Sequence, residues 1–97
     1  MSVLEKDIET AVKEYARFKG CLAFKFVSPG HSFVPDALII APDGRVTFVE
    51  FKRPGGKATP GQLREMQRIR EHNVPAVVID DVVAGKAYIS NWLAGLC

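Results

Sequence analysis

The sequence predicts an α/β fold in which helices flank a central mixed sheet, with the element order α-β-β-β-α-β-α. Three observations predict it: apolar residues recur with helical spacing near both ends of the chain, four short strand-like runs lie between them, and turn-forming residues separate the runs. A chain of 97 residues is long enough for one hydrophobic core and too short for two. Residues 1–97 are therefore expected to form a single domain.

The first helix is predicted over residues 4–18, because apolar side chains recur there at intervals of three and four. The apolar stripe of this helix consists of Leu4, Ile8, Ala11, Val12, Tyr15 and Phe18. Gly20 ends the helix, residues 21–27 follow as a strand, and turn-forming residues at 28–32 indicate a loop. One face of this strand is expected to carry Leu22, Phe24 and Phe26.

A β-hairpin is predicted from residues 36–41 and 45–52, which the sequence Pro42-Asp43-Gly44 joins. A three-residue hairpin loop usually ends in a residue with positive φ, and Gly44 occupies that position. The loop type matters because it fixes which residues of the two strands face each other.

This register places Asp36 directly opposite Glu50, with Cβ atoms about 5 Å apart. Lys52 points the same way, two residues further along the strand. A two-residue loop would instead pair Asp36 with Phe51 and separate the two carboxylates. The position of Gly44 favours the first register.

The second helix is predicted from its first residues. Thr59 is the expected N-cap, Pro60 suits the first helical position, and Gln62 completes a capping box. The helix is expected to run to about His72. Because helices usually stop before a residue that precedes proline, the chain then leaves the helix at Val74-Pro75.

A short buried strand is predicted at residues 76–79, and a final helix follows with Asp80 or Asp81 as its cap. Gly85 is expected to weaken the start of this helix. The side chains expected to point inward are Val82, Val83, Ile89, Trp92, Leu93 and Leu96.

Composition excludes several classes of protein. The formal net charge of +2 is too small to predict nucleic-acid binding by itself, so any basic face must be local. The longest apolar stretch, residues 37–41, is far too short to cross a bilayer, and the N-terminus carries acids where a signal peptide is basic. We therefore expect a cytoplasmic protein with no membrane partner. Cys21 and Cys97 form no metal-binding or disulfide pattern and are expected to be ordinary thiols.

The facing carboxylates predict a metal site. Two like charges opposite each other destabilise a hairpin unless something neutralises them, and Mg²⁺ or Mn²⁺ prefers such oxygen ligands. Lys52 beside them can orient or help deprotonate an attacking water, which is the chemistry of a metal-dependent phosphodiesterase. The alternative is a solvated strand face on which Glu50 and Lys52 form a weak charge pair. The apolar neighbours of both strands favour the metal site.

The chain resembles the PD-(D/E)XK nuclease superfamily, which has a restriction-endonuclease-like core. The resemblance rests on Pro35-Asp36, on Glu50-Phe51-Lys52 and on a first helix that bears Glu5. Within the superfamily the chain is most similar to the VRR-NUC (virus-type replication-repair nuclease) family, through residues 25–30, 34–36, 44–56 and 59–62. One departure is Phe33, which stands where relatives often have glycine.

The resemblance implies roles for six residues. Asp36 and Glu50 would bind the catalytic metal, joined by the backbone carbonyl of Phe51, and Lys52 would be the catalytic lysine. Glu5 would be the acidic residue of the first helix, reaching the metal directly or through water. Gln62 would contact the active site or a phosphate. For the last two there are simpler interpretations, since an acid suits a helix N-terminus and Gln62 completes a capping box.

Basic residues near these positions are candidates for DNA contact. Arg53 and Lys57 are the strongest candidates, because they flank the expected site in a glycine-rich loop whose backbone can approach a phosphate. Lys25 and Arg45 are further candidates, as are Arg64, Arg68 and Arg70. Arg64 and Arg68 fit a solvated helix face better, paired with Glu65 and Glu71, and His31 is expected to be incidental.

The resemblance also implies an activity. Small stand-alone VRR-NUC proteins of viral or bacterial type look like Holliday-junction resolvases, which cut four-way DNA junctions as homodimers by means of a metal-activated water. We therefore expect such an enzyme in the cytoplasm of a bacterial or phage-infected cell. The dimer surface could be the first helix, the Phe33 loop or the Trp92 region. The alternatives are a flap or branched-DNA nuclease within a larger complex, and a non-catalytic DNA-binding module.

Overall fold

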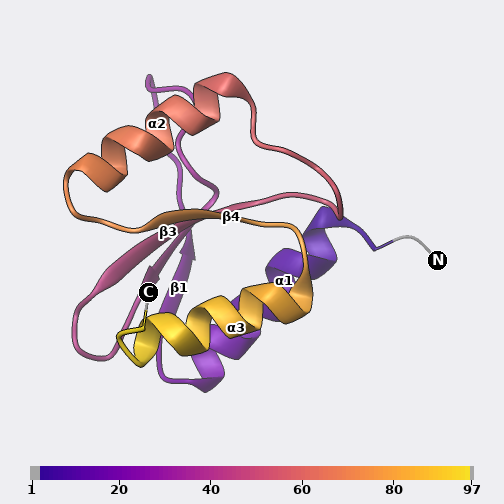
Figure 1. The fold of residues 1–97 in the computed structure, drawn as a ribbon, viewed down its shortest axis with the longest axis vertical. Coiled ribbons are helices and arrows are strands. Elements are labelled where there is room, and N and C mark those ends of the chain that lie inside the picture. The colour runs from indigo at the N-terminus through magenta and orange to yellow at the C-terminus, as the bar shows by residue number, and fades with distance from the viewer. Residues whose placement is uncertain (1–2, 97) are drawn as a thin grey trace.

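The computed structural model describes residues 3–96 and has the predicted order of elements (Figure 1). The four strands form one sheet in the order β1-β2-β3-β4, in which only β3 and β4 are parallel. The prediction of an α/β fold with a mixed sheet is confirmed. The elements are α1 (Glu5–Phe18), β1 (Leu22–Lys25), β2 (Ala37–Ile40), β3 (Val46–Phe51), α2 (Pro60–Glu71), β4 (Ala76–Ile79) and α3 (Val82–Leu93).

The helices form two layers around the sheet. Helices α1 and α3 lie together on one face, and α2 lies on the other (Figure 1). The main core fills the space between the sheet and the α1–α3 layer, because alternate strand residues point to that side. Its fully buried members include Ile8, Val12, Ile39, Val49 and Ile89.

Helix α1 has a narrower apolar stripe than its sequence predicts. The buried residues are Ile8, Val12 and Ala16, at intervals of four. Leu4 and Phe18 were expected in the stripe, but they are 60% and 84% exposed. The prediction is wrong for these two, because they lie at the ends of the helix, beyond the part that the sheet and α3 cover. Strand β1 is likewise shorter than predicted, and its Leu22 and Phe24 face solvent.

The hairpin has the predicted three-residue loop. Ala41 donates its N–H to the carbonyl of Arg45 at 2.8 Å, and Gly44 closes the turn with φ of 92°. Ala37 pairs with Val49 in the resulting register. The register that directs Asp36 toward Glu50 is therefore confirmed.

The capping box of α2 is also confirmed. The Thr59 hydroxyl accepts a hydrogen bond from the Gln62 N–H at 3.2 Å, and the Thr59 N–H donates to Gln62 Oε1 at 2.9 Å. The helix ends at Glu71 with His72 as its C-cap. Asn73 then adopts a positive φ of 63°, which turns the chain toward β4.

Helix α3 differs from the prediction at both ends. Val83 and Leu96, which were expected to point inward, are 77% and 75% exposed, and the helix ends at Leu93. Asp81 is the cap, because its side chain accepts a hydrogen bond from the Ala84 N–H at 2.8 Å. Gly85 does not prevent the helix from starting at Val82. A Cβ at position 85 would lie 2.6 Å from Val12 Cγ2, so this glycine permits close packing of α3 on α1.

Two remaining expectations concern cysteines and membranes. Cys21 is a buried free thiol, whereas Cys97 lies outside the described residues. Burial raises the pKa of the Cys21 thiol, which keeps it protonated. Over residues 3–96, no helix has both the length and the apolar character needed to cross a membrane.

Candidate active site

The two facing acids lie where β2 and β3 begin to separate. Asp36 directly precedes β2, and its Oδ2 accepts a hydrogen bond from the Phe51 N–H at 2.9 Å. The carbonyl of Asp36 also accepts a hydrogen bond from the Phe26 N–H at 2.7 Å. The Asp36 side chain thus continues the β2–β3 ladder beyond the last backbone pair, which fixes the position of its carboxylate.

Glu50 is a buried carboxylate with one unpaired oxygen. Its residue is only 3% exposed, and its Oε1 has no hydrogen-bond partner among the described residues. Its Oε2 accepts a hydrogen bond from Gln62 Nε2 at 3.3 Å and lies 3.6 Å from Lys52 Nζ. The alternative of a solvated strand face is therefore wrong for Glu50.

The surroundings of Glu50 oppose its ionisation. Burial, followed by the neighbouring Asp36 carboxylate, raises the pKa of Glu50 to about 7, and Lys52 acts in the opposite direction. A buried carboxyl with an unpaired oxygen beside a second carboxylate costs free energy in the absence of a cation. Such perturbed groups are typical of functional sites.

Gln62 links α2 to the candidate site. Its Oε1 completes the capping box with Thr59, while its Nε2 donates to Glu50. The two interpretations that the sequence left open are therefore compatible, because opposite ends of one amide group perform the two tasks. The structure thus places the Gln62 amide against Glu50, and its role in an active site stays a prediction.

The donor set fits a hard divalent cation. Asp36 and Glu50 offer carboxylate oxygens, one of them without a partner, and Mg²⁺ commonly binds through one or two protein carboxylates while keeping several waters. Within residues 3–96, no three His, Cys, Asp or Glu side chains gather closely enough to hold a metal ion. The structure therefore does not bring Glu5 into one cluster with the other two acids. The contribution of the Phe51 carbonyl stays a prediction.

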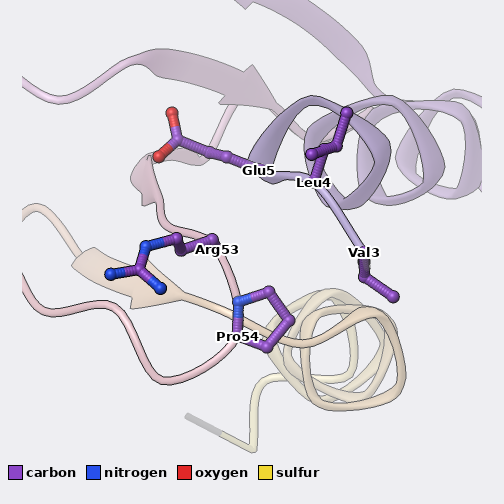
Figure 2. A pocket seen from close by; sticks show the side chains of 5 residues that line it. All are labelled: Val3, Leu4, Glu5, Arg53 and Pro54. Atoms are coloured by element: carbon purple, nitrogen blue, oxygen red, sulfur yellow. The ribbon is translucent and has the colours of Figure 1, made fainter. Parts of the chain in front are cut away.

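Glu5 lies at the start of α1, on the opposite layer from Gln62, and is exposed. It lines a hollow of about 550 Å³ between the start of α1 and the loop after β3. Figure 2 shows its carboxylate and the guanidinium of Arg53 extending in the same direction from two walls of this hollow.

The candidate DNA contacts fall into two groups. Within residues 3–96, the side chains of Lys25, Arg53 and Lys57 form no hydrogen bond or ion pair with the protein. Lys25 pairs with Ala37 and so lies at the Asp36 end of the sheet, whereas Arg53 and Lys57 follow β3 directly. These three cations are available to a phosphate ligand.

Arg45 belongs to the other group, because the structure places it at the far end of β3. Its guanidinium donates to the carbonyls of Trp92 and Leu93 at 2.6 and 2.9 Å and to the Asp43 carboxylate at 2.7 Å. The contacts with the two carbonyls cap the C-terminus of α3. The pKa of Asp43 is lowered by a hydrogen bond from the Arg45 backbone N–H and then by the one from its guanidinium. Arg45 therefore acts within the fold and is not brought to the site.

Other basic side chains also have partners in the protein. Arg68 pairs with Glu65 at 3.0 Å, as expected for a solvated helix face, and Arg70 donates to the Ala76 carbonyl at 2.8 Å. Glu65 also pairs with His31 at 2.9 Å, so this histidine ties its loop to α2. The His31 and Arg68 contacts lower the pKa of Glu65 against the opposing effect of desolvation.

The loop before Asp36 holds Phe33 in a backbone conformation that suits glycine. Phe33 has φ of 71°, a conformation that glycine adopts without strain. Its ring packs closely over Gly61 at the start of α2, because a Cβ at that glycine would lie 3.0 Å from the ring. Phe33 thus keeps the backbone shape that a glycine allows and adds a contact to the helix that carries Gln62.

The sequence prediction missed a role for Asp80. We considered Asp80 only as a helix cap, but its Oδ2 accepts a hydrogen bond from the Gly55 N–H at 3.2 Å. The parallel pairing of β3 and β4 brings this acid beside the loop after β3. The signal in the sequence that could have indicated this role is the position of Asp80 directly after a buried strand.

Comparisons with known proteins agree with this geometry. A family model described as the VRR-NUC domain matches residues 5–82. A protein of Acyrthosiphon pisum secondary endosymbiont phage 1 named "Putative nuclease p44" is 44% identical over 78 residues, covering 80% of this chain and 84% of that protein.

Two solved structures are also similar. One, titled "VRR_NUC domain", has a TM-score of 0.84 at 31% identity and covers 91% of this chain and 96% of its own. Another, titled "VRR_NUC domain protein", has a TM-score of 0.74 at 20% identity, covers 97% of this chain and 91% of its own, and supports the fold.

Proposed function

Since the chain belongs to the VRR-NUC domain family, we propose that this nuclease is a metal-dependent DNA endonuclease that cuts four-way DNA junctions as a homodimer. The observation that carries the metal dependence is the buried Glu50 carboxylate, which has an unpaired oxygen beside Asp36. A bound cation would supply the partner that this oxygen lacks. The expected cation is Mg²⁺ or Mn²⁺, because both prefer carboxylate oxygens.

Asp36 and Glu50 would hold this cation, with the Phe51 carbonyl and Glu5 as further expected oxygen donors. When bound, the cation polarises the phosphodiester and makes a water more acidic. Lys52 orients the attacking water and offsets the negative charge that develops on the phosphate. The Lys52 side chain is only 18% exposed, so its charge acts in a site with little competing solvent.

The unpartnered cations near the site support DNA as the substrate. Lys25, Arg53 and Lys57 can each bind a backbone phosphate without breaking an existing ion pair of the described residues. Phosphate contacts of this kind position the DNA without selecting a base sequence.

The homodimer is proposed from the reaction, because two symmetric nicks require two active sites. Of the three surfaces considered from the sequence, the Trp92 region has the least support, since the Trp92 side chain is only 3% exposed and packs in the core. Leu4 and Phe18 of the α1 region and Phe33 remain exposed and available.

Labelled four-way junction, flap, single-stranded and linear duplex DNA, each incubated with the purified protein, would test the proposed function. We expect paired symmetric nicks in the junction with Mg²⁺ or Mn²⁺ and none with EDTA. Preferential cutting of the flap or of the single strand would replace the resolvase by a flap or branched-DNA nuclease. Binding without cleavage under every condition would indicate a non-catalytic module.

A substitution at Gln62 separates its two tasks. In Gln62→Glu, one carboxylate oxygen can still accept the Thr59 N–H, but the group facing Glu50 becomes an acceptor that repels it. We expect cleavage activity or metal affinity to fall about 10- to 100-fold, as is typical when a partner of a metal ligand is lost. Cleavage rates at increasing Mg²⁺ concentrations measure this effect.

Gln67→Glu is the matched control, because Gln67 is exposed on the same helix and undergoes the same chemical change. Equal activities of the two variants would contradict a role for the contact between Gln62 and Glu50.

A further inference from the structure

The mechanism above gives expected roles to Glu5 and Arg53, but it assigns no ligand to the hollow that these two residues line. This hollow has a volume of about 550 Å³ and is lined by Val3, Leu4, Glu5, Arg53 and Pro54. Figure 2 shows two walls, one formed by the start of α1 and the other by the loop after β3. Three of the five lining side chains are apolar, so most of the hollow offers van der Waals contact.

The second wall, formed by the loop after β3, is a hydrogen-bonded turn. The Gly56 N–H donates to the Arg53 carbonyl at 2.8 Å, with Pro54 and Gly55 between them and φ of 77° at Gly55. This arrangement is a type II turn, which favours proline and glycine at these two positions. The side chain of Asp80 holds the turn from outside through the Gly55 N–H at 3.2 Å.

The hollow directly adjoins the candidate catalytic residues along the chain. Lys52 donates its N–H to the Ile79 carbonyl at 3.0 Å, which fixes the last residue before the turn. Arg53 follows Lys52, and consecutive Cα atoms are about 3.8 Å apart. A DNA strand that places one phosphate at Lys52 can therefore reach Arg53, and with it the hollow, with an adjacent nucleotide.

The chemistry of the walls identifies a ligand class. Leu4 and Pro54 offer apolar surface to a flat ring, and the Arg53 guanidinium has no hydrogen-bond or ion-pair partner within residues 3–96. A nucleotide matches both features, since its base has apolar faces and its phosphate is an anion. Because every base has such faces, binding of this kind tolerates any base sequence.

We propose that this hollow receives an unpaired nucleobase next to the scissile phosphate, while Arg53 binds the phosphate of the same nucleotide. This inference rests on the proposed nuclease function. A fully paired duplex must unstack and unpair a base before it can fill the hollow, whereas branched DNA offers an unpaired base at little cost. The hollow thus gives a single protomer a preference for irregular DNA, in addition to any preference that arises from dimerisation.

Binding measurements in EDTA test the proposal, with one duplex that carries a single unpaired 2-aminopurine and one fully paired duplex. We expect the wild-type protein to bind the first about tenfold more tightly, with a change in 2-aminopurine fluorescence. Val3→Trp fills the hollow and Leu4→Glu places a negative charge in it, so both variants should lose this preference. Both positions are about half-exposed, and circular dichroism verifies the fold.

Leu22→Trp is the matched control, because Leu22 is an equally exposed aliphatic residue at the opposite end of the sheet from Asp36. It should retain the wild-type preference. Equal binding of the two duplexes by the wild-type protein, or an unchanged preference in both hollow variants, would overturn the proposal. The assay requires no cleavage, so the two proposals can fail separately. A protein that binds in this way but cuts no DNA would contradict the nuclease mechanism and would not contradict the proposed role of the hollow.

Discussion

We expect Asp36→Asn and Glu50→Gln each to lower the rate of DNA cleavage by at least about 10³-fold, since a bound cation supplies several kcal/mol of transition-state stabilisation. Both changes remove a negative charge and keep the size of the side chain. The Asn oxygen can still accept the Phe51 N–H, and the Gln oxygen can accept from Gln62, so the local hydrogen bonds survive. Single-turnover cleavage of a labelled junction measures the loss.

DNA affinity separates this effect from a loss of binding. Both variants should bind junction DNA at least as well as the wild-type protein, because the substitutions reduce repulsion of phosphates. Glu14→Gln is the matched control, since Glu14 is an exposed acid on α1 whose conversion removes the same charge. If both active-site variants cleave at the wild-type rate, Asp36 and Glu50 do not form the metal site.

The features that could be predicted from the sequence depend on short stretches of chain. The hairpin register follows from a three-residue loop that ends in Gly44, and the start of α2 follows from Thr59 and Gln62 within one helical turn. Because the register fixes which side chains face each other, the approach of Asp36 to Glu50 could be inferred without a structure.

The features that could not be predicted depend on contacts between distant segments. Arg45 resembles a free surface cation in sequence, but its partners are carbonyls at the end of α3, 47 and 48 residues away. From the sequence, Gly85 is expected to weaken the start of its helix, whereas the structure shows that it allows α3 to pack closely on Val12. Such roles depend on where α3 lies on the sheet, which no local pattern specifies.

The candidate site combines both kinds of information. Local patterns identified Glu50 and Gln62, but the contact between them requires α2 to lie on the face of the sheet that carries Glu50. The unpaired Oε1 of Glu50 likewise results from the packing of several elements around one side chain. The burial of Glu50, which rules out a solvated strand face, therefore appeared only in the folded structure.

The stability of the metal-free protein should fall as the pH rises from 5 to 8. Burial and the Asp36 carboxylate raise the pKa of Glu50 from 4.5 to about 7, so the folded state retains a proton that the unfolded state releases. The stabilisation from protonated Glu50 is complete below about pH 4.5 and is lost as the pH rises through about 7. A tenfold change in proton affinity is worth about 1.4 kcal/mol, so the loss approaches about 3 kcal/mol.

Thermal unfolding in EDTA across this pH range measures the effect, and Glu50→Gln is the decisive variant because it has no proton to lose. We expect its unfolding temperature to vary much less with pH and to exceed that of the wild-type protein at pH 8. The lowered pKa values of Asp43 and Glu65 act below this range, and the raised pKa of Cys21 acts above it.

Mg²⁺ should reverse the pH effect in the wild-type protein. A cation that binds the ionised pair of carboxylates competes with the proton, so its stabilising effect grows with pH. In Glu50→Gln the added cation should have little effect at any pH, whereas Glu14→Gln should respond as the wild-type protein does. A wild-type unfolding temperature that does not fall between pH 5 and 8 in EDTA would show that Glu50 is ionised without a cation. The free-energy argument for a metal at this site would then fail.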